Sequence, residues 1–299
     1  MKELVSKKVL ITGITGFTGL YLERLLKAKG YSVFGTTLFK NENKNHFVCD
    51  LRNLSDIKHI VGTIKPNYIF HLAGISFAAE QNRSLIYDVN VIGTENLLES
   101  IIKCELSPEK ILIASSATVY GNQNEIILNE SMCPNPVNHY GYSKMIMEQM
   151  TKTYFNKLNI IITRPFNYTG VGQSKNFLIP KIVKHFNERK KIIELGNIYV
   201  AREFNNIIDI SNIYYQLMLS DKINMIVNLC SGQAIYLSEI VNYLNLLARY
   251  EIQIQINPDF VRENEIKSLK GSTALLKSII TYQFEYDIYD TLKKMYAFK

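Results

Sequence analysis

The chain of 299 residues has no tryptophan, only four cysteines and only seven prolines. Cys49, Cys104, Cys133 and Cys230 are far apart and form no CxxC pair, so the sequence indicates neither a zinc site nor a disulfide framework. It also lacks an apolar run of about 18 residues and the apolar core of a signal peptide. These absences exclude metal-finger, disulfide-rich and membrane-spanning classes, and we expect a soluble cytoplasmic protein without a metal.

A concentrated patch of one charge sign is also missing, although the net charge is +7. The lysines are scattered along the chain, whereas a nucleic-acid-binding stripe clusters them with aromatic residues. An anionic small ligand explains the positive balance as well as nucleic acid does, and nucleic acid binding would predict a steep salt dependence. We therefore expect a small-molecule partner and neither nucleic acid nor a membrane.

The first half of the sequence alternates between strand-like and helix-like segments. KKVLITG is a short apolar run, FTGLYLERLLKAKG has helical periodicity, and YSVFGTT is rich in β-branched and aromatic residues. The pattern continues with helices near 54–64, 84–103 and 140–157 and with strands at NYIFHLA, EKILIAS and NIIITRP. Such βαβ repetition predicts an α/β fold with a doubly wound parallel sheet of the Rossmann type.

After Pro165 the alternation becomes less regular. We expect a helix at 178–189, short strands near 192 and 205, and then helix, strand, helix through 250. The sequence therefore predicts a Rossmann domain over 1–165, to which 206–229 returns, and a smaller mixed α/β lobe over 166–299. No Pro/Ser-rich hinge separates them, so we expect the two lobes to pack tightly.

Three glycines lie between the first strand and the first helix. Gly13, Gly16 and Gly19, in ITGITGFTG, permit a tight turn and let backbone N–H groups and a helix N-terminus approach a pyrophosphate. The spacing is GxxGxxG instead of the commonest GxGxxG, so an ordinary glycine turn is the alternative interpretation.

The end of the second strand, about 20 residues further on, distinguishes the two nicotinamide dinucleotides. An acidic residue there would bind the ribose 2′-OH of NAD, whereas a cation would suit the 2′-phosphate of NADP. No acid follows the strand directly in GTTLFKNENK; Thr36, Thr37 and Lys40 suit a phosphate, although Glu42 is close. We expect NADP as the cofactor, with NAD as the alternative.

Tyr140 stands four residues before Lys144 in HYGYSK, so on a helix the phenol and the ammonium share a face. The same spacing recurs at Tyr289 and Lys293 in an ordinary amphipathic segment, so spacing alone proves nothing. A nearby ammonium lowers the phenol pKa from its usual value of about 10 and eases proton exchange at neutral pH. Ser116 follows the strand EKILIAS and is expected at the C-terminal edge of the sheet, where such sheets bind ligands.

Seven stretches, in order, resemble the extended short-chain dehydrogenase/reductase family that acts on nucleotide sugars. They are TGITGFTG, CDL, HLAG, VNVIGTENLL, SSATVYG, YGYSK and RPFNYTGVGQ, and the resemblance covers nearly the whole chain. The later stretches LGNIYVAREFNNIIDI and VNLCSG are most similar to GDP-4-keto-6-deoxy-mannose reductases and the related GDP-mannose dehydratases.

The resemblance implies roles for the matching residues. Ser116, Tyr140 and Lys144 would be the catalytic trio. The cofactor would contact this trio's Tyr140 and Lys144 together with Gly13, Gly16, Phe17, Thr18, Gly19, Lys40, Asp50 at the adenine, Leu51, Leu72, Ala73, Gly74, Asn90, Pro165 and Phe166. The substrate would contact Ser76, Thr118, Asn167, Phe177, Lys181, Arg202, Arg262 and Glu265.

Among these residues, Asn167, Arg202 and Arg262 would hold the diphosphate of the substrate, and Glu265 would reach the substrate's ribose. Each arginine could instead form an ion pair with the neighbouring Glu203 or Glu263. The resemblance also implies a homodimer, formed by a four-helix bundle that would use the helices near 84–103 and 140–157.

The residues at two positions limit which reactions we expect. Where the 4,6-dehydratases carry an acid, two residues after the catalytic serine or threonine, this chain has Thr118; where GDP-fucose synthases carry a second-lobe histidine, it has Phe177. Neither side chain is a useful acid or base near pH 7, so deprotonation of a carbon next to the carbonyl lacks its machinery.

Simple hydride transfer at C4 is then the expected chemistry. We expect NADPH-dependent reduction of a nucleotide-linked 4-keto-6-deoxy sugar in deoxysugar biosynthesis for a surface polysaccharide such as O-antigen. Tyr140 would donate the proton and Ser116 a hydrogen bond. A 4-epimerase with retained NAD is the alternative, and a non-catalytic dinucleotide sensor is a third interpretation that the intact trio argues against.

Overall fold

The computed structural model describes residues 6–76, 82–123, 125–260 and 268–298. The chain divides into two compact units. Unit 1 comprises Met1–Val119, Pro136–Arg164 and Ser211–Val227, and unit 2 comprises Tyr120–Asn135, Pro165–Ile210 and Asn228–Lys299.

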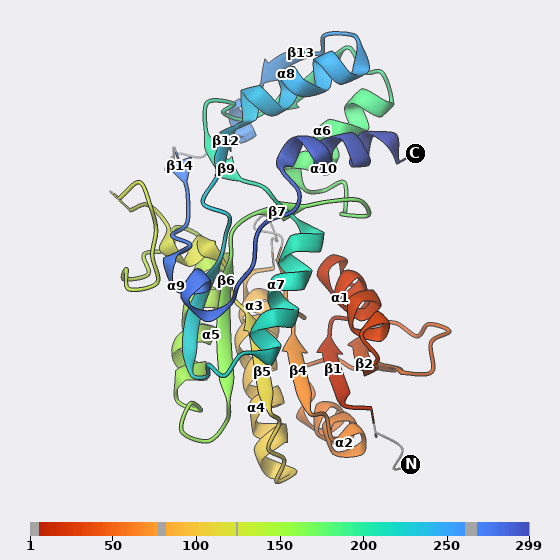
Figure 1. The fold of residues 1–299 in the computed structure, drawn as a ribbon, viewed down its shortest axis with the longest axis vertical. Coiled ribbons are helices and arrows are strands. Elements are labelled where there is room, and N and C mark those ends of the chain that lie inside the picture. Colours follow the sequence, from red (N-terminus) through yellow and green to blue (C-terminus); the bar gives the residue numbers. More distant parts are fainter. Residues whose placement is uncertain (1–5, 77–81, 124, 261–267, 299) are drawn as a thin grey trace. The chain divides into compact units, whose positions relative to one another are not determined.

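A seven-stranded sheet forms the centre of unit 1 (Figure 1). Its strands, in spatial order, are β11 (Met225–Leu229), β6 (Ile160–Pro165), β5 (Lys110–Ala114), β4 (Tyr68–His71), β1 (Lys8–Thr12), β2 (Ser32–Thr37) and β3 (His46–Val48). Parallel pairing joins β1 to both β2 and β4, with Val9 opposite Val33 on one side and Tyr68 on the other. The chain winds outward in both directions from β1 and β4, which confirms the predicted doubly wound sheet.

Helices cover both faces of this sheet. On one face, α2 (Leu54–Ile64), α4 (Gly93–Lys103) and α5 (His139–Lys152) form a core with strand residues that include Leu10, Ile69, Ile111 and Ile160. On the other, α1 (Phe17–Ala28) and α7 (Ile207–Leu219) pack, with the rings of Phe70 and Tyr214 centred 6.0 Å apart. Burial on both faces explains why the strands read as near-continuous apolar runs.

The helix expected over 84–103 is interrupted. It consists of α3 (Arg83–Tyr87), a π-helical turn η1 (Asp88–Ile92) and α4. Single π turns inside helices often occur at functional sites. This turn carries Asn90, which is buried with 1% of its surface exposed.

Unit 2 has a smaller core, in which α6 (Leu178–Asn187), α8 (Leu237–Ala248) and α10 (Ile288–Ala297) pack together. Its strand pairs are short: β8 (Ile192–Leu195) with β13 (Gln253–Ile256), β9 (Ala201–Glu203) with β12 (Ala234–Tyr236) and β14 (Ser268–Leu269), and β7 (Tyr168–Thr169) with β10 (Asn205–Asn206). The helix α9 (Ala274–Ile279) also belongs to this unit.

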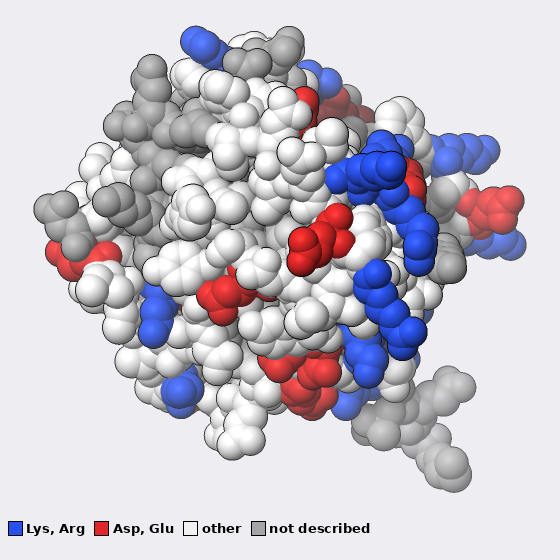
Figure 2. Space-filling view, turned by 90° about the horizontal axis from the view of Figure 1, so that it is seen from above, with Lys and Arg blue, Asp and Glu red and all other residues white. Residues whose placement is uncertain are grey.

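None of the helices in the described ranges has the length and apolarity that crossing a membrane requires. On the face drawn in Figure 2, basic side chains gather along one side, with acidic ones among and beside them, while uncharged residues cover most of the surface.

Candidate active site

The three expected catalytic residues lie on neighbouring segments of unit 1. Ser116 lies between β5 and the 3₁₀ turn η2 (Ala117–Tyr120), while Tyr140 and Lys144 occupy the first two turns of α5. Asn138 caps α5, its side-chain oxygen accepting from the Gly141 N–H at 2.8 Å. Ser116 and Tyr140 are each 9% exposed and Lys144 is 6% exposed, so little water reaches them.

Gly141 brings the start of α5 against the turn that follows Ser116. A Cβ atom at this position would lie 3.0 Å from the Thr118 carbonyl oxygen and 2.8 Å from the Pro136 Cβ. Only glycine permits this close approach. The backbone beside Tyr140 therefore contacts the backbone two residues after Ser116.

Lys144 extends from α5 to the end of β5. Its Nζ donates to the Ala114 carbonyl at 2.7 Å, and a Cβ on Gly74 would lie 3.4 Å from this nitrogen. Burial lowers the pKa of Lys144 from 10.5 to about 8, and the negative charge of Glu148 opposes this shift. The lysine is therefore mainly protonated at neutral pH.

Asn90 ties the loop after β4 to α5. Its Oδ1 accepts from the Ile75 N–H at 2.8 Å, and its Nδ2 donates to the Ile75 carbonyl at 3.1 Å and to Ser143 Oγ at 3.0 Å. Ser143 Oγ donates in turn to the Tyr140 carbonyl at 2.8 Å. The π turn thus places Asn90 between the loop after β4 and the helix that carries Tyr140 and Lys144.

A second chain of hydrogen bonds runs through buried His71, which sequence reasoning did not single out. The Ala73 N–H donates to Thr12 Oγ1, which lies 2.8 Å from His71 Nδ1. His71 Nε2 lies 2.9 Å from Thr94 Oγ1, which donates to the Asn90 carbonyl. Because burial lowers the pKa of His71 to about 3, the ring is neutral. Since Thr94 Oγ1 gives its own proton to the Asn90 carbonyl, we infer that it accepts from His71 Nε2, which then carries the ring proton.

The hydroxyl of Ser116 accepts two hydrogen bonds from Thr118. The Thr118 N–H lies 3.2 Å and its Oγ1 lies 2.9 Å from Ser116 Oγ. Since a serine hydroxyl carries one donor and two acceptor positions, this arrangement directs the Ser116 proton to another acceptor. A carbonyl oxygen of a substrate is a suitable acceptor.

The glycine loop has the conformation that the sequence predicted. Gly13 has φ +69°, and a Cβ on it would lie 2.9 Å from the Ala73 Cα, so no other residue fits without strain. Gly19 is similarly close to the Ile14 carbonyl oxygen, at 2.5 Å from a Cβ built on it. α1 starts at Phe17 with no acidic residue in its first turn and no side-chain cap on Gly16. A helix start of this kind fits the pyrophosphate of a dinucleotide.

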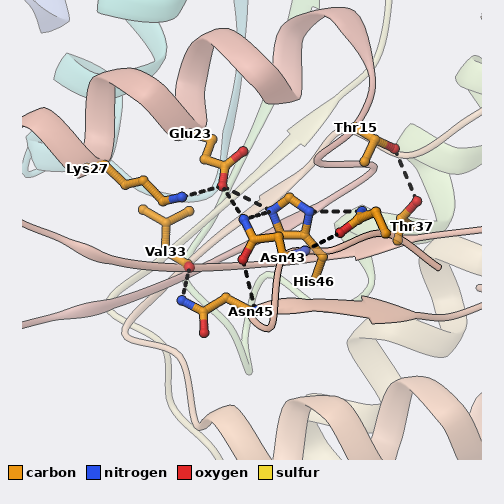
Figure 3. A network of polar contacts seen from close by, with 9 residues as sticks. Thr15, Glu23, Lys27, Val33, Thr37, Asn43, Asn45 and His46 are labelled. Atoms are coloured by element: carbon orange, nitrogen blue, oxygen red, sulfur yellow. Dashed lines mark hydrogen bonds and ion pairs between the residues drawn. The ribbon is translucent and has the colours of Figure 1, made fainter. Parts of the chain in front are cut away.

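A polar network holds the segment that follows β2 against α1 (Figure 3). Glu23 Oε1 accepts from Lys27 Nζ at 2.6 Å and from Asn43 Nδ2 at 3.3 Å, and lies 3.0 Å from His46 Nε2. Thr37 Oγ1 lies 3.2 Å from Thr15 Oγ1 in the glycine loop. The run NENKNH gave no prediction of these contacts, because they depend on a residue of α1 about 20 positions earlier.

Several other expected cofactor residues have defined surroundings. Asp50 forms a bidentate ion pair with Arg52, whose hydrogen bonds lower the pKa of this carboxyl group. Leu51 and Phe166 are buried, Leu72, Ala73 and Pro165 are half-buried, Thr18 is buried, and Lys40 and Gly74 are exposed. Their contacts with the dinucleotide stay predictions.

Of the expected substrate residues, Ser76 and Thr118 lie in unit 1, and the structure describes four more in unit 2. Asn167 is exposed, and Phe177 immediately precedes α6. Lys181 Nζ donates to the Glu194 carbonyl at 2.9 Å, and Arg202 donates to the Ala201 carbonyl at 2.8 Å. Arg262 and Glu265 lie outside the described residues.

Glu203, the expected alternative partner of Arg202, has a different environment. Its buried carboxylate accepts from the backbone N–H groups of Ser231 at 2.9 Å, Gly232 at 3.2 Å and Gly271 at 2.6 Å. Burial raises its pKa, and these hydrogen bonds oppose that shift. Glu203 therefore joins three segments of unit 2.

A family model described as GDP-mannose 4,6 dehydratase matches residues 10–295. The chain belongs to this family. It is therefore an NAD(P)-dependent enzyme of the extended short-chain dehydrogenase/reductase type that acts on a nucleotide sugar, as the resemblance predicted.

Two relatives each align with 97% of this chain. GDP-6-deoxy-D-talose 4-dehydrogenase of Aggregatibacter actinomycetemcomitans is 35% identical, with 97% of its own length covered. GDP-6-deoxy-D-mannose reductase of Pseudomonas aeruginosa is 26% identical, with 96% covered. A crystal structure from Burkholderia cenocepacia J2315, named as a candidate epimerase, is 36% identical, covers 97% of both chains and superposes with a TM-score of 0.91.

Proposed function

We propose that the enzyme is an NADPH-dependent reductase of a GDP-linked 4-keto-6-deoxy sugar and acts at C4, in deoxysugar biosynthesis for a surface polysaccharide. The observation that carries the proposal is the buried group of Ser116, Tyr140 and Lys144, with the uncharged Thr118 hydrogen-bonded to Ser116. Both relatives are named for enzymes of GDP-6-deoxy sugars, one as a 4-dehydrogenase and one as a reductase, which supports the substrate class.

Each residue of the trio has a defined task in this reduction. When bound, the nicotinamide cofactor supplies the hydride that adds to the carbonyl carbon at C4. Tyr140 donates its phenolic proton to the carbonyl oxygen, and Ser116 donates a hydrogen bond that stabilises the negative charge developing there. The ketone becomes a secondary alcohol, and the Tyr140 phenolate, stabilised by the charge of Lys144, regains a proton from solvent.

The residues around the trio support reduction over dehydration. Thr118 occupies the position at which a dehydratase uses an acid, and its hydroxyl donates to Ser116. A threonine hydroxyl neither removes nor delivers a proton at a neighbouring carbon near pH 7. Hydride transfer at C4 is then the step for which the trio supplies the catalytic groups.

The names of the two relatives support one configuration of the product at C4. The names 6-deoxy-talose and 6-deoxy-mannose describe sugars that differ at C4, and the talose enzyme is the more similar of the two relatives, at 35% against 26% identity. We therefore propose GDP-6-deoxy-D-talose as the first candidate for the product.

The end of β2 supports NADP as the preferred cofactor. Thr36 and Thr37 are fixed by contacts to the glycine loop, Lys40 is exposed, and no acidic residue follows the strand directly. We expect Lys40→Ala to weaken NADPH binding about 10-fold and to leave NADH binding within about 2-fold, because only NADP carries the 2′-phosphate. Tighter binding of NADH than NADPH by the unchanged enzyme would refute this assignment.

We also propose that Asn167 and Arg202 bind the substrate diphosphate. A guanidinium group offers planar, multiple donors that suit phosphate oxygens. Arg202→Ala should raise the substrate KM about 10-fold or more with little change in the cofactor KM. An unchanged substrate KM would show that the diphosphate binds elsewhere.

A 4-epimerase is the second candidate, because the structural relative at 36% identity is named as a candidate epimerase. An epimerase retains its cofactor and turns its substrate over with no net oxidation of NADPH. Copurification of bound NAD, together with interconversion of two fully reduced nucleotide sugars, would favour the 4-epimerase.

The deciding experiment offers the enzyme NADPH and a panel of 4-keto-6-deoxy sugars linked to GDP, dTDP, UDP and CDP. We expect NADPH oxidation with the GDP-linked ketone, and an axial C4 hydroxyl in the product by NMR. Absence of NADPH oxidation with every member of the panel would overturn the proposed reduction.

A further inference from the structure

A buried ion pair lies directly behind the catalytic trio, within unit 1. Glu148 of α5 is 0% exposed and Arg164 of β6 is 2% exposed. The Arg164 Nε lies 3.0 Å from Glu148 Oε1 and its Nη2 lies 2.7 Å from Oε2, which is a bidentate arrangement. This pair therefore fixes the orientation of the Glu148 carboxylate.

The same carboxylate binds the residue that precedes Ser116. Ser115, 3% exposed, donates its hydroxyl to Glu148 Oε1 at 2.5 Å, and its backbone N–H donates to the Thr163 carbonyl at 2.7 Å. Side chain and backbone of Ser115 are thus both held. Because one peptide bond joins Ser115 to Ser116, a Ser115 that is held at both its side chain and its backbone limits where the Ser116 backbone can lie.

Glu148 also shares a helix face with the other two members of the trio. It lies one turn after Lys144 and two turns after Tyr140. Among the described residues, the groups that face Lys144 include Tyr140 and Glu148 on its own helix, the neutral His71 on β4 and the Ala114 carbonyl on β5. The charge of Arg164 on β6 is directed at Glu148. Glu148 is therefore the nearby negative charge that acts on the lysine.

A buried ion pair of this kind is a poor stabiliser. Removing two charges from water is costly, and well-packed apolar residues of similar volume often serve stability as well or better. Its position, in contact with one neighbour of Ser116 and one turn from Lys144, suits a role in the chemistry.

We propose that the Glu148–Arg164 pair is a positioning device for catalysis, which holds the Ser116 end of β5 and the Lys144 turn of α5 in a single geometry. Two separable effects follow, one through the hydrogen bond to Ser115 and one through the negative charge. The proposal rests on the reductase function above for its kinetic readout.

Ser115→Ala tests the hydrogen bond alone, because it leaves the ion pair intact. We expect kcat to fall about 10-fold or more, since small displacements of catalytic groups are costly, while both KM values stay within about 2-fold. The alkaline limb of the pH profile of kcat should not move in this variant.

The double variant Glu148→Gln/Arg164→Met tests the charge. The glutamine oxygen can still accept from Ser115, and the paired replacement removes both charges of the ion pair together, so that neither partner stays buried without the other. Without the carboxylate, the Lys144 pKa should fall, and the alkaline limb should move to lower pH. Thr151→Val, at a buried α5 residue, is the matched control and should leave kcat and the pH profile unchanged.

A titration of Lys144 by NMR, on protein with isotope-labelled lysine and without substrate, makes the test independent of turnover. A lower midpoint in the double variant than in the unchanged enzyme supports the proposal even if the reductase assignment is wrong. Wild-type kcat in Ser115→Ala, with the same Lys144 midpoint and pH profile in the double variant, would overturn it and leave the pair as ordinary core.

Discussion

At the scale of single residues, Tyr140 is the group whose loss should be most specific. Tyr140→Phe keeps the ring and removes only the proton donor, so kcat should fall by about 10²- to 10⁴-fold. The NADPH dissociation constant should change little. Stopped-flow measurement of NADPH oxidation, together with fluorescence titration of the cofactor, checks both quantities.

Wild-type turnover by the Tyr140→Phe enzyme would rule out the phenol as the proton donor. Tyr289→Phe is the matched control, because Tyr289 has the same spacing to a lysine in α10 but was predicted to be an ordinary surface residue. This variant should be as active as the unchanged enzyme.

Lys144 should reveal a conflict between stability and function. Its folded-state pKa of about 8 is below the value of 10.5 for a lysine in solution, so the buried ammonium destabilises the folded state at neutral pH. Lys144→Met should abolish most activity and raise the free energy of unfolding at pH 7 by about 1–3 kcal/mol. Urea denaturation at fixed pH measures this difference.

The difference in the free energy of unfolding between Lys144→Met and the wild type should decrease as the pH rises. Between pH 8 and 10.5 the unfolded wild-type chain binds more protons at this lysine than the folded chain, so wild-type stability rises with pH. The advantage of Lys144→Met should therefore be full below about pH 8 and shrink as the pH approaches 10.5. A difference independent of pH would mean that the lysine is not desolvated as described.

At the scale of elements, the glycine turn between β1 and α1 offers a comparison of two glycines with similar backbone angles. Gly13, with φ +69°, packs against Ala73, whereas Gly30, with φ +86°, follows the other end of α1 and has open space around it. Gly13→Ala should weaken NADPH binding about 10-fold or more, because its methyl group would displace the loop. Gly30→Ala should reduce stability and leave cofactor affinity unchanged.

Calorimetric titration with NADPH distinguishes these outcomes. Equal affinity in the Gly13→Ala and Gly30→Ala enzymes would place the dinucleotide away from this turn. Thermal unfolding of both variants provides the stability control, since both positions require a backbone conformation that alanine rarely adopts.

Helices and strands with a clear hydrophobic pattern were predictable from the sequence, whereas irregular turns inside a helix were not. The strands around Val9, Ile69 and Ile111 follow from apolar runs bounded by turn residues, and α2 begins and ends where the pattern indicates. The π turn at Asp88–Ile92 left no trace in the pattern, because one extra residue in a turn changes a helical period too little to read.

The site shows the same division. The places of Ser116 after β5 and of Tyr140 and Lys144 on one helix were predictable, because these residues occur in short motifs at fixed spacing. The links through His71, Glu148 and Glu203 join residues far apart in sequence, and each such residue taken alone resembles many buried or surface residues. Distance along the chain, and not chemistry, kept them out of the prediction.

At the scale of the whole molecule, the homodimer implied by the family resemblance stays a prediction. Ile92, Tyr142 and Ile146 on η1 and α5 are large apolar side chains with 41–44% of their surface exposed. Ile146→Asp should place a charge in the interface of the expected four-helix bundle and shift the protein to a monomer. Analytical ultracentrifugation of both proteins measures the change.

Ile256→Asp, at an apolar residue of β13 that is 48% exposed, is the control for this substitution and should keep the wild-type assembly state. A wild-type protein that sediments as a monomer would contradict the expected dimer. Activity of the Ile146→Asp monomer would then show whether the trio, which lies within one unit of one chain, needs a second copy.

The path of the chain between the two units has a consequence for biosynthesis. Residues 120–135 and 165–210 belong to unit 2, yet the strand that borders β6 in the sheet, β11, comes only at Met225–Leu229. During translation, the open edge of β6 therefore has no native neighbour until residue 229 has left the ribosome tunnel, and a nascent chain stalled before that point presents a strand edge to chaperones or to other nascent chains.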